Sequence, residues 1–176
     1  MAMTLQRKIL LGELGQVLRD IVLNRLVASV AVPRKVRTTL LRRRGHDIHP
    51  TGLMNAGVFL GSWRGLTMGE RVFVNYRCFF DLGSTVTIGS DTRIGYESMF
   101  VTCGHAIGDE SDRAGRPIDS PIIVGAGCWI GARVTVLPGV SIGDGCVIAS
   151  GSVVAEDCEP NGFYAGVPAV RKRCLP

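Results

Sequence analysis

The residue best suited to proton transfer is His105, at the start of a polar stretch. The chain has three histidines, and the other two, His46 and His49, precede the repetitive part of the sequence described below. Residues 105–119 read HAIGDESDRAGRPID, which is polar and interrupted by glycine and proline. An imidazole takes up and returns a proton near neutral pH. His105 is therefore the first candidate for a general base, although a lone histidine is also a common structural hydrogen-bonding residue.

The cysteines show no metal-binding or redox spacing. They stand at positions 78, 103, 128, 146, 158 and 174, and no two of them form a CxxC pair. The first residues include Arg7, Lys8 and Glu13 and lack the apolar segment and cleavage site of a secretory signal. We therefore expect reduced, mostly buried thiols in a cytoplasmic protein, with neither a disulfide framework nor a metal site.

The element that must position His105 is a six-residue repeat. An apolar residue recurs every six positions, with a phase slip at residue 82 and a gap at the polar stretch. These residues are Ile48, Met54, Leu60, Leu66, Val72, Cys78, Leu82, Ile88, Ile94, Phe100, Val124, Ile130, Val136, Ile142, Ile148 and Val154. The chain also has 23 glycines and only 6% aromatic residues. This composition is typical of many tight turns around a narrow aliphatic core.

A six-residue period fits a short strand followed by a corner, and it is too short for a helix with its connection. Three units then make one triangular coil, and each coil hydrogen-bonds to the next at about 4.8 Å. Residues 48–158 without the polar stretch give about five coils, enough for a solenoid stabilised by stacking. The polar stretch 105–119 is expected to leave the coil as an excursion loop, and such loops are usually functional.

The excess positive charge lies in the first quarter of the chain. Residues 1–45 contain ten basic residues against Glu13 and Asp20, a net of +8, while the remainder has ten against thirteen, a net of −3. The ten are Arg7, Lys8, Arg19, Arg25, Arg34, Lys35, Arg37, Arg42, Arg43 and Arg44. A basic arm on a mildly acidic body suits an anionic surface such as membrane lipid or a charged glycan.

The basic arm is expected to be helical. Its apolar residues recur at helical spacing, as Leu14, Val17, Leu18, Ile21 and Val22 show. We expect one helix over residues 4–30, ended by Pro33, and a short basic helix over 34–44, ended by Gly45. The first helix can pack on its own domain, on a neighbouring subunit or in the plane of a membrane. Nucleic acid is not expected as a partner, because the arm has no aromatic residue to stack on bases.

Three segments resemble the maltose, galactoside and Nod-factor O-acetyltransferases and the acetyltransferases of polysaccharide biosynthesis. They are VGAGCWIGARVTVLPGVSIGDGCVIASGSVV, the terminal NGFYAGVPA and the upstream FVNYRCFFD, which together with the His-led loop span residues 72–173. The resemblance implies an all-β fold, a left-handed parallel β-helix of hexapeptide repeats with an N-terminal α-helical arm. It also implies acetyl-CoA as co-substrate, a hydroxyl of a sugar or glycan as acceptor, and a homotrimer with sites between subunits. The bacterial surface-polysaccharide enzymes are the nearest in style.

The resemblance assigns roles residue by residue. His105 matches the general base that activates the acceptor hydroxyl for direct transfer, and Asn75 and, less securely, Asp81 match acceptor-binding residues. Residues matching the acetyl-CoA site are Trp129, Ala132 (whose N–H would meet the oxyanion), Ala149, Ser150, Arg171, Lys172 and Arg173. Two features depart from the family. Ala155-Glu156 replaces a Thr-Lys pair that contacts CoA, and the family's glutamate that orients the histidine has no clear counterpart, since Asp119 is near its position but not in register.

The boundaries that follow are a basic helical arm at 1–45, the β-helix at 46–160 with its excursion at 105–119, and a C-terminal tail at 161–176. The arm would hold a cytoplasmic enzyme at the inner face of the membrane, near a lipid-linked glycan. Three alternatives stay open: an N-acetyltransferase, a serine-type acyltransferase on the same fold, and a non-catalytic β-helix that serves as an assembly scaffold. A γ-type carbonic anhydrase is disfavoured, because the repeat region has one histidine where that site needs three.

Overall fold

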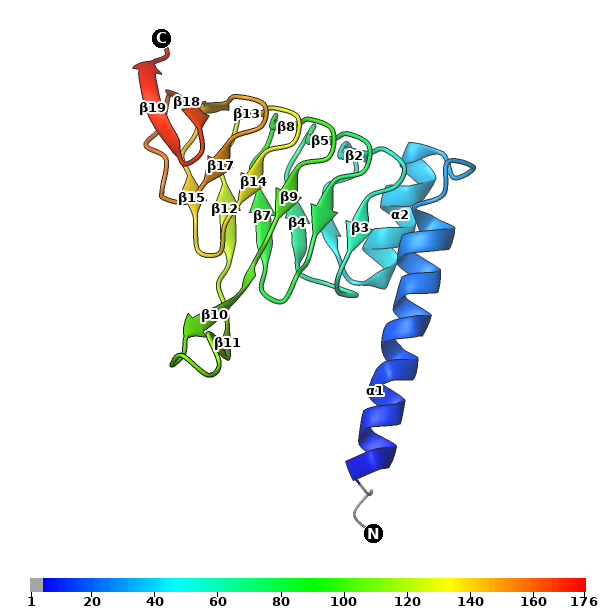
Figure 1. Cartoon of the computed structure of the whole chain (residues 1–176). Helices are drawn as coiled ribbons and strands as arrows, with labels where there is room; N and C mark the ends of the chain where they lie inside the picture. Colours follow the sequence, from blue (N-terminus) through cyan, green and yellow to red (C-terminus); the bar gives the residue numbers. More distant parts are fainter. Residues whose placement is uncertain (1–4) are drawn as a thin grey trace.

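The apolar repeat forms three parallel sheets that close into a triangular prism (Figure 1). The computed structural model describes residues 5–176. Face A consists of β1 (Asp47–Ile48), β4 (Leu66–Met68), β7 (Val86–Ile88), β12 (Ile122–Val124) and β15 (Ser141–Ile142). Face B consists of β2 (Leu53–Met54), β5 (Phe73–Val74), β8 (Arg93–Ile94), β13 (Trp129–Ile130), β16 (Val147–Ile148), β18 (Gly162–Gly166) and β19 (Ala169–Cys174). Face C consists of β3 (Phe59–Leu60), β6 (Phe79–Phe80), β9 (Met99–Phe100), β14 (Thr135–Val136) and β17 (Val153–Val154).

The core is a set of three aliphatic and aromatic ladders, one for each face. Each two- or three-residue strand sends its last residue inward, and the same position of the next coil lies directly above it. On face A the ladder is Ile48, Met68, Ile88, Val124 and Ile142. On face C, Phe80 and Phe100 stack with ring centroids 4.8 Å apart, which is the spacing of adjacent strands. The fold prediction is thus confirmed as a β-solenoid with a helical N-terminal region.

The phase of the repeat differs from the expectation in the second coil. Val72 and Cys78 are buried, as predicted, but the strand residues that occupy the ladders are Val74 and Phe80. The slip placed at Leu82 is in fact distributed. The first coils advance by 20 residues, as from Ile48 to Met68, and the later ones by 18, as from Val124 to Ile142. The extra residues lie between faces C and A, at 61–65 and 81–85. We call this edge, including residues 101–121, the C–A corner.

The N-terminal region forms three helical segments. α1 (Leu5–Arg19) continues into a π-helical segment, η1 (Asp20–Val27), and α2 (Arg34–Arg44) follows Pro33. Gly45 ends α2 with φ of 112°, a left-handed conformation that glycine adopts at little cost. The end expected at Gly45 is therefore confirmed, whereas the first helical run ends at Val27 and Pro33 is instead the N-cap of α2.

The helices after α1 close the open end of the solenoid. The first coil would otherwise present unpaired backbone groups along the edge of each sheet. Asn24 of η1 pairs with both polar groups of Leu60 in β3, accepting from its N–H at 2.9 Å and donating to its carbonyl at 3.2 Å. The N–H of Gly57 donates to the carbonyl of Ala28 at 2.8 Å. Residues 20–44 are thus the cap of the solenoid rather than a separable arm.

Arg37 is the central residue of this cap, and only 2% of its surface is exposed. Its guanidinium donates to the carbonyl oxygens of Val27, Met54, Ser29 and Val32 at 2.7–3.0 Å. Burial lowers the pKa of Arg37 from its ordinary value. From the sequence, Arg37 was expected to be part of a basic surface. In the structure its guanidinium is buried and hydrogen-bonded inside the cap.

The C-terminal segment forms a hairpin at the opposite end of the prism. β18 pairs with β16 in parallel, and β19 folds back antiparallel on β18. Cys158 bridges to Ile142 and adds a further rung to face A. The solenoid therefore has about six turns, one more than predicted, and the segment expected as a tail extends face B.

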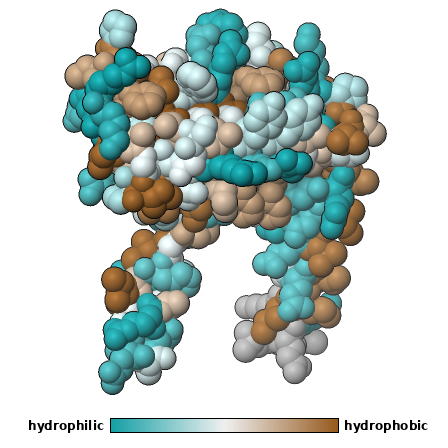
Figure 2. Space-filling model, turned by 45° about the horizontal axis from the view of Figure 1, so that its top comes forward, coloured by the Kyte–Doolittle hydropathy of each residue, from teal (hydrophilic) through white to brown (hydrophobic). Residues whose placement is uncertain are grey.

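Two elements project from the same side of the prism (Figures 1 and 2). One is α1, and the other is the antiparallel hairpin of β10 (Cys103–Ile107) and β11 (Ala114–Asp119). The excursion predicted at 105–119 is thus an ordered hairpin that begins two residues earlier. Within residues 5–176, no helix combines the length and the apolar character that a membrane crossing takes.

The six cysteines have free thiols, and four of them are buried between the faces. Burial raises the pKa of Cys78 and of Cys128 to about 11 and that of Cys158 to about 12. These thiols are accordingly protonated packing residues at neutral pH.

Candidate active site

His105 lies on the exposed first strand of the β10–β11 hairpin, and one of its ring nitrogens is fixed. Nδ1 is 2.8 Å from the carbonyl oxygen of Gly115 on the facing strand. A carbonyl only accepts, so Nδ1 carries the proton, and the lone pair of the neutral ring is on Nε2. Gly115 therefore does what the sequence analysis could not assign to an acidic residue: it sets the orientation and the tautomer. An exposed Nε2 with a free lone pair can act as a general base.

Asp81 fixes the base of the same hairpin. Its carboxylate accepts from the backbone N–H of Thr102 at 2.9 Å, from the Thr102 hydroxyl and from the N–H of Cys103 at 3.1 Å. Burial alone would raise the pKa of Asp81, but these hydrogen bonds outweigh it and hold the pKa below its ordinary value. The carboxylate predicted to bind the acceptor is therefore engaged with the backbone three residues before His105.

Asn75 lies on a different edge, between faces B and C. We call this edge the B–C corner; its rungs are residues 55–57, 75–77, 95–97, 131–133 and 149–151. The side-chain oxygen of Asn75 accepts from Nδ2 of Asn55 and from the N–H of Tyr76, each at 3.0 Å. No partner is found within residues 5–176 for the Asn75 Nδ2 group. Its amide is held by the oxygen and can donate outward to a ligand oxygen.

The residues expected to line the acetyl-CoA arm gather on the B–C corner. Ala132 and Ser150 line a hollow of about 570 Å³, with Tyr96 at one end and Gly151 at the other. The N–H of Ala132, expected to meet an oxyanion, donates to the Ser150 hydroxyl at 3.1 Å. Ala149 follows the inward residue of β16 on the same corner. Small side chains on two successive rungs are what opens this hollow.

A charge ladder borders the hollow. Glu97 accepts from Arg77 at 2.6 Å and from Arg133 at 2.8 Å, one rung to either side. Hydrogen bonds from Arg133 and then Arg77 lower the pKa of Glu97 from its ordinary value. This ladder was not among the features expected from the sequence, although residues 77 and 97 are separated by the 20-residue advance of the early coils.

Trp129 and the C-terminal cations share face B. The outward residue of each strand in register gives one row: Leu53, Phe73, Arg93, Trp129, Val147, Phe163 and Arg173. Trp129 is 61% exposed, and Arg173 lies over the Phe163 ring at 5.4 Å. Arg171 donates to the carbonyl of Pro160 at 3.0 Å, and Lys172 is exposed. The three predicted cations thus lie on β19, at the end of the same face.

The predicted residues fall into two groups on different corners of the prism. Asp81 and His105 follow strands of face C and belong to the C–A corner, while Asn75, Ala132 and Ser150 follow strands of face B. Face C separates the two corners. One chain therefore does not bring the base and the cofactor-lining residues into a single cleft.

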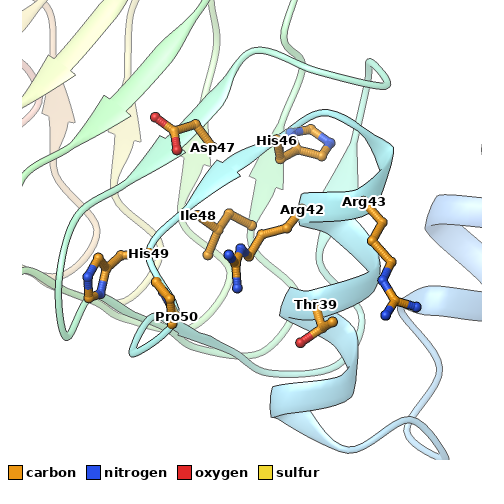
Figure 3. Close-up of a pocket in the computed structure, with 8 residues that line it drawn as sticks. All are labelled: Thr39, Arg42, Arg43, His46, Asp47, Ile48, His49 and Pro50. Atoms are coloured by element: carbon orange, nitrogen blue, oxygen red, sulfur yellow. The ribbon is translucent and has the colours of Figure 1, made fainter.

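A further hollow of about 570 Å³ lies between α2 and β1, and Figure 3 shows its lining. Arg42 and Arg43 come from α2, and His46 and His49 come from the segment that follows. In Figure 3 the two arginine side chains point in different directions, so the cations do not converge on one ligand position. Burial lowers the pKa of His46 to about 4, which keeps it neutral. We therefore do not assign the site to this hollow.

Comparison with known proteins agrees with the β-solenoid fold. The family model described as bacterial transferase hexapeptide (six repeats) matches residues 121–156. The galactoside O-acetyltransferase of Escherichia coli is 30% identical over 132 residues, which are 75% of this chain and 65% of that protein. Curated relatives match over about half to two thirds of their own length, with 49% and 65% as two examples.

Two solved structures extend the similarity over almost the whole fold. A maltose O-acetyltransferase from Clostridium difficile has a TM-score of 0.80 and 27% identity, and the match covers 93% of this chain and 88% of that one. A hexapeptide-repeat acetyltransferase from Vibrio cholerae, in complex with acetyl-CoA, has a TM-score of 0.78 and 25% identity, covering 98% and 91%.

Proposed function

The chain belongs to the hexapeptide-repeat acetyltransferase family as a homologue of the maltose and galactoside O-acetyltransferases, and from this premise we propose that it transfers the acetyl group of acetyl-CoA to a hydroxyl of a sugar or glycan. The observation that carries the proposal is the exposed His105, whose Nδ1 is held by Gly115 and whose Nε2 is left free. The sequence similarity to the E. coli enzyme and the acetyl-CoA complex of the V. cholerae structure support the choice of donor.

The proposed reaction is a direct transfer. Nε2 of His105 takes the proton of the acceptor hydroxyl, and the oxygen attacks the thioester carbon. The C–S bond breaks, and the imidazolium returns the proton to the departing thiolate. A backbone N–H stabilises the oxyanion that forms in between, and we assign this to Ala132, which would exchange its bond to Ser150 for one to the oxyanion.

We propose that the working enzyme is a homotrimer whose sites combine the C–A corner of one subunit with the B–C corner of another. The two-corner arrangement supports this, because base and cofactor residues are separated by face C within one chain. The outer rows of the faces support it as well. Face A is mainly polar, with Asp47, Thr67, Thr87, Ile123 and Ser141, whereas face C presents Phe59, Phe79, Met99, Thr135 and Val153. Partly exposed apolar faces of this kind suit subunit contacts.

The acetyl-CoA arm would lie along the B–C corner, with Ala149 and Ser150 beside it and Trp129 on the adjoining face. The nucleotide end would reach β19, where Arg171, Lys172 and Arg173 provide cations for phosphate. Asn75 would donate from Nδ2 to an acceptor oxygen. Asp81 enters the proposal as a positioning residue for the hairpin, since its carboxylate oxygens are already engaged by Thr102 and Cys103.

For α1 we propose contact with an anionic membrane surface, which would place the enzyme near a lipid-linked acceptor. Its apolar residues are unusually exposed, at 48–57%, as Figure 2 shows in brown. On one side of the helix they are Leu10, Leu11, Leu14, Val17 and Leu18, continued by Ile21 in η1, while the equally exposed Ile9 lies on the opposite side. At 100° per residue the α1 side chains from Leu10 to Leu18 share one side of the helix, and in η1 Leu23 and Val27 are buried against the first coil. Arg7 and Arg25 flank the apolar stripe.

The proposed activity is tested by a screen of sugars and glycosides with acetyl-CoA, read as free thiol release and as acetylated product by mass spectrometry. We expect product only with hydroxyl acceptors. Amino sugars are included, and product only on their amino group would favour the N-acetyltransferase alternative. A protein that binds acetyl-CoA but forms no acetylated product with any acceptor would favour the scaffold alternative.

A further inference from the structure

A second hollow lies on the B–C corner, next to the cofactor hollow, with which it shares Arg77 and Tyr96. It measures about 370 Å³ and is lined by Val30, Ala56, Gly57, Tyr76, Arg77 and Tyr96. A further hollow of about 420 Å³ adjoins it and shares Val30, Ala56 and Tyr76. Arg77 of the charge ladder lines the first of these hollows and Arg37 of the cap lines the other, but neither hollow has been assigned a ligand.

The tyrosines separate the two halves of the corner. The rings of Tyr76 and Tyr96 are stacked, with centroids 6.2 Å apart and planes within 7° of each other. Tyr96 lines both hollows, whereas Tyr76 lines the second hollow with Ala56 and does not line the cofactor hollow. Both rings are about half exposed. The corner is therefore open where its side chains are small, and the two stacked rings stand between Ala56 and Ala132 in the order of the rungs.

The rung geometry fixes the width of the second hollow. The N–H of Gly57 bonds to Ala28, and that of Arg77 bonds to Ala56, so residues 28–30 occupy the rung before Ala56 and Tyr76 the rung after it. Rungs are about 4.8 Å apart, so Val30 and Tyr76 stand about 10 Å apart along the corner. A ring stacked on the free face of Tyr76 would lie at the level of Ala56, where there is no larger side chain. The second hollow thus forms a slot that accepts one ring between the face of Tyr76 and the aliphatic side chain of Val30.

The chemistry of the slot favours a sugar. A pyranose has an apolar C–H face that packs on an aromatic ring and hydroxyl groups at its rim, which suit the neighbouring Asn75 amide. A nucleobase would also stack, but the cations expected to meet CoA phosphates lie on β19, at the other end of the solenoid. We propose that the slot between Val30 and Tyr76 binds a sugar ring of an oligosaccharide acceptor, and that this ring is not the one acetylated.

The distance along the corner gives the second half of the proposal, which rests on the proposed function. The slot is at the Ala56 rung and the thioester is expected at the Ala132 rung, three rungs away by way of Tyr76 and Tyr96. That is about 14 Å, more than one pyranose ring spans. An acceptor that fills both positions must contain several linked sugars. The enzyme would therefore prefer an oligosaccharide to the corresponding monosaccharide.

The test measures sugar binding and turnover separately on the full chain. Saturation-transfer NMR with methyl α-glucoside, maltotriose, methyl β-galactoside and lactose reports binding without turnover. Thiol release reports KM for the same sugars and for acetyl-CoA. The variants are Tyr76→Ala, which removes the platform, and Val30→Trp, which fills the slot from a side chain that is 87% exposed. Tyr76→Phe keeps the ring and serves as the matched control.

We expect an oligosaccharide to bind the unchanged protein more tightly than its monosaccharide. Tyr76→Ala and Val30→Trp should weaken that binding about tenfold, the effect of losing one stacked ring, and Tyr76→Phe should preserve it. KM for acetyl-CoA should stay unchanged. Thermal melting of each variant confirms that it is folded.

Three results would overturn the proposal: no binding of any oligosaccharide, equal binding of mono- and oligosaccharides, or a Tyr76→Ala defect confined to acetyl-CoA. The last would place the cofactor in the slot. Absence of thiol release and product with every acceptor would instead refute the proposed function, and the NMR comparison would still decide whether Tyr76 holds a sugar.

Discussion

The Nδ1 atom of His105 and the carbonyl oxygen of Gly115 lie 2.8 Å apart across the β10–β11 hairpin. This contact joins the expected base to the backbone of the strand that returns to the solenoid. Replacing His105 by Asn should lower kcat by a factor of about 10²–10⁴, the usual worth of a general base. His49→Asn is the control, because His49 lies outside the hairpin. A kcat for His105→Asn within threefold of the unchanged enzyme would remove His105 from the mechanism.

Asp81 predicts a positioning effect rather than a binding effect. Asp81→Asn keeps the shape but replaces a charged acceptor of the Thr102 and Cys103 N–H groups with a neutral one. We expect a loss of about 1–3 kcal/mol in unfolding free energy, as for weakened hydrogen bonds to a charged group, together with a lower kcat. KM for the acceptor should change little. A rise in acceptor KM without any loss of stability would restore Asp81 to the acceptor site.

The ionised Asp81 carboxylate should also make the stability of the fold depend on pH in the acid range. Its pKa is lower in the folded chain than in the unfolded one, so it stabilises the fold above its ordinary pKa, and that contribution is lost as pH falls through the folded value. Urea titrations between pH 5 and pH 2 should show a smaller loss of stability in Asp81→Asn than in the unchanged protein. An equal loss of stability in the two proteins would mean that other carboxylates determine the acid unfolding.

His46 predicts a loss of stability at a higher pH. Burial lowers its pKa to about 4 in the folded chain, whereas the unfolded chain binds the proton near 6.5. Stability present above pH 6.5 should therefore fall as pH drops from 6.5 to 4, by up to about 3 kcal/mol. His46→Gln should flatten this window, and His49→Gln, at a half-buried position, should not. Urea midpoints at intervals across the window provide the measurement.

Arg37 predicts that the cap is essential to the solenoid. Arg37→Met keeps the aliphatic stem but leaves four carbonyl oxygens without their donor. We expect a loss of about 3–5 kcal/mol of stability, as for breaking a buried charged network. Arg43→Met, on the exposed side of α2, should change the stability by less than about 0.5 kcal/mol. Similar values for the two variants would contradict the assignment of Arg37 as the cap's central residue.

Variants in the apolar stripe of α1 can show whether it contacts a lipid surface or a neighbouring subunit. Leu14→Glu with Leu18→Glu should abolish sedimentation with vesicles of 30% phosphatidylglycerol, while light scattering without lipid gives the same mass as the unchanged protein. The control is Gln16→Glu, which adds negative charge outside the stripe. A variant that loses its oligomeric state instead would assign the stripe to a subunit contact. Point variants are used because residues 20–44 cap the first coil.

The repeat could be predicted from sequence because each inward position needs an apolar side chain of limited size. The second coil was misphased for a definite reason: Val72 and Val74 are both apolar and both buried, so periodicity alone cannot tell which one is in the strand. The cap was misjudged because a count of charges cannot separate Arg37, inside the structure, from Arg43, on its surface.

The candidate site was predictable in its residue types and not in its arrangement. His105 could be chosen from its place at a break in the repeat, and its exposure agrees with a chemical role. Its partner Gly115 could not, because a backbone carbonyl has no signature in the sequence. The separation of Asn75 from His105 depends on which corner each occupies, and this requires the strand register.

At the B–C corner, the backbone maintains the fold, whereas the side chains at the tip of each rung determine which ligand fits. Backbone bonds such as Arg77 N–H to Ala56 and Gly151 N–H to Ala132 hold the rungs together whatever side chain stands at the tip. The side chain at the tip of each rung therefore widens or narrows the corner at its own level, independently of the others. These positions are 56, 76, 96, 132 and 150. A single substitution at one of these positions can therefore change which molecule fits, without repacking the interior.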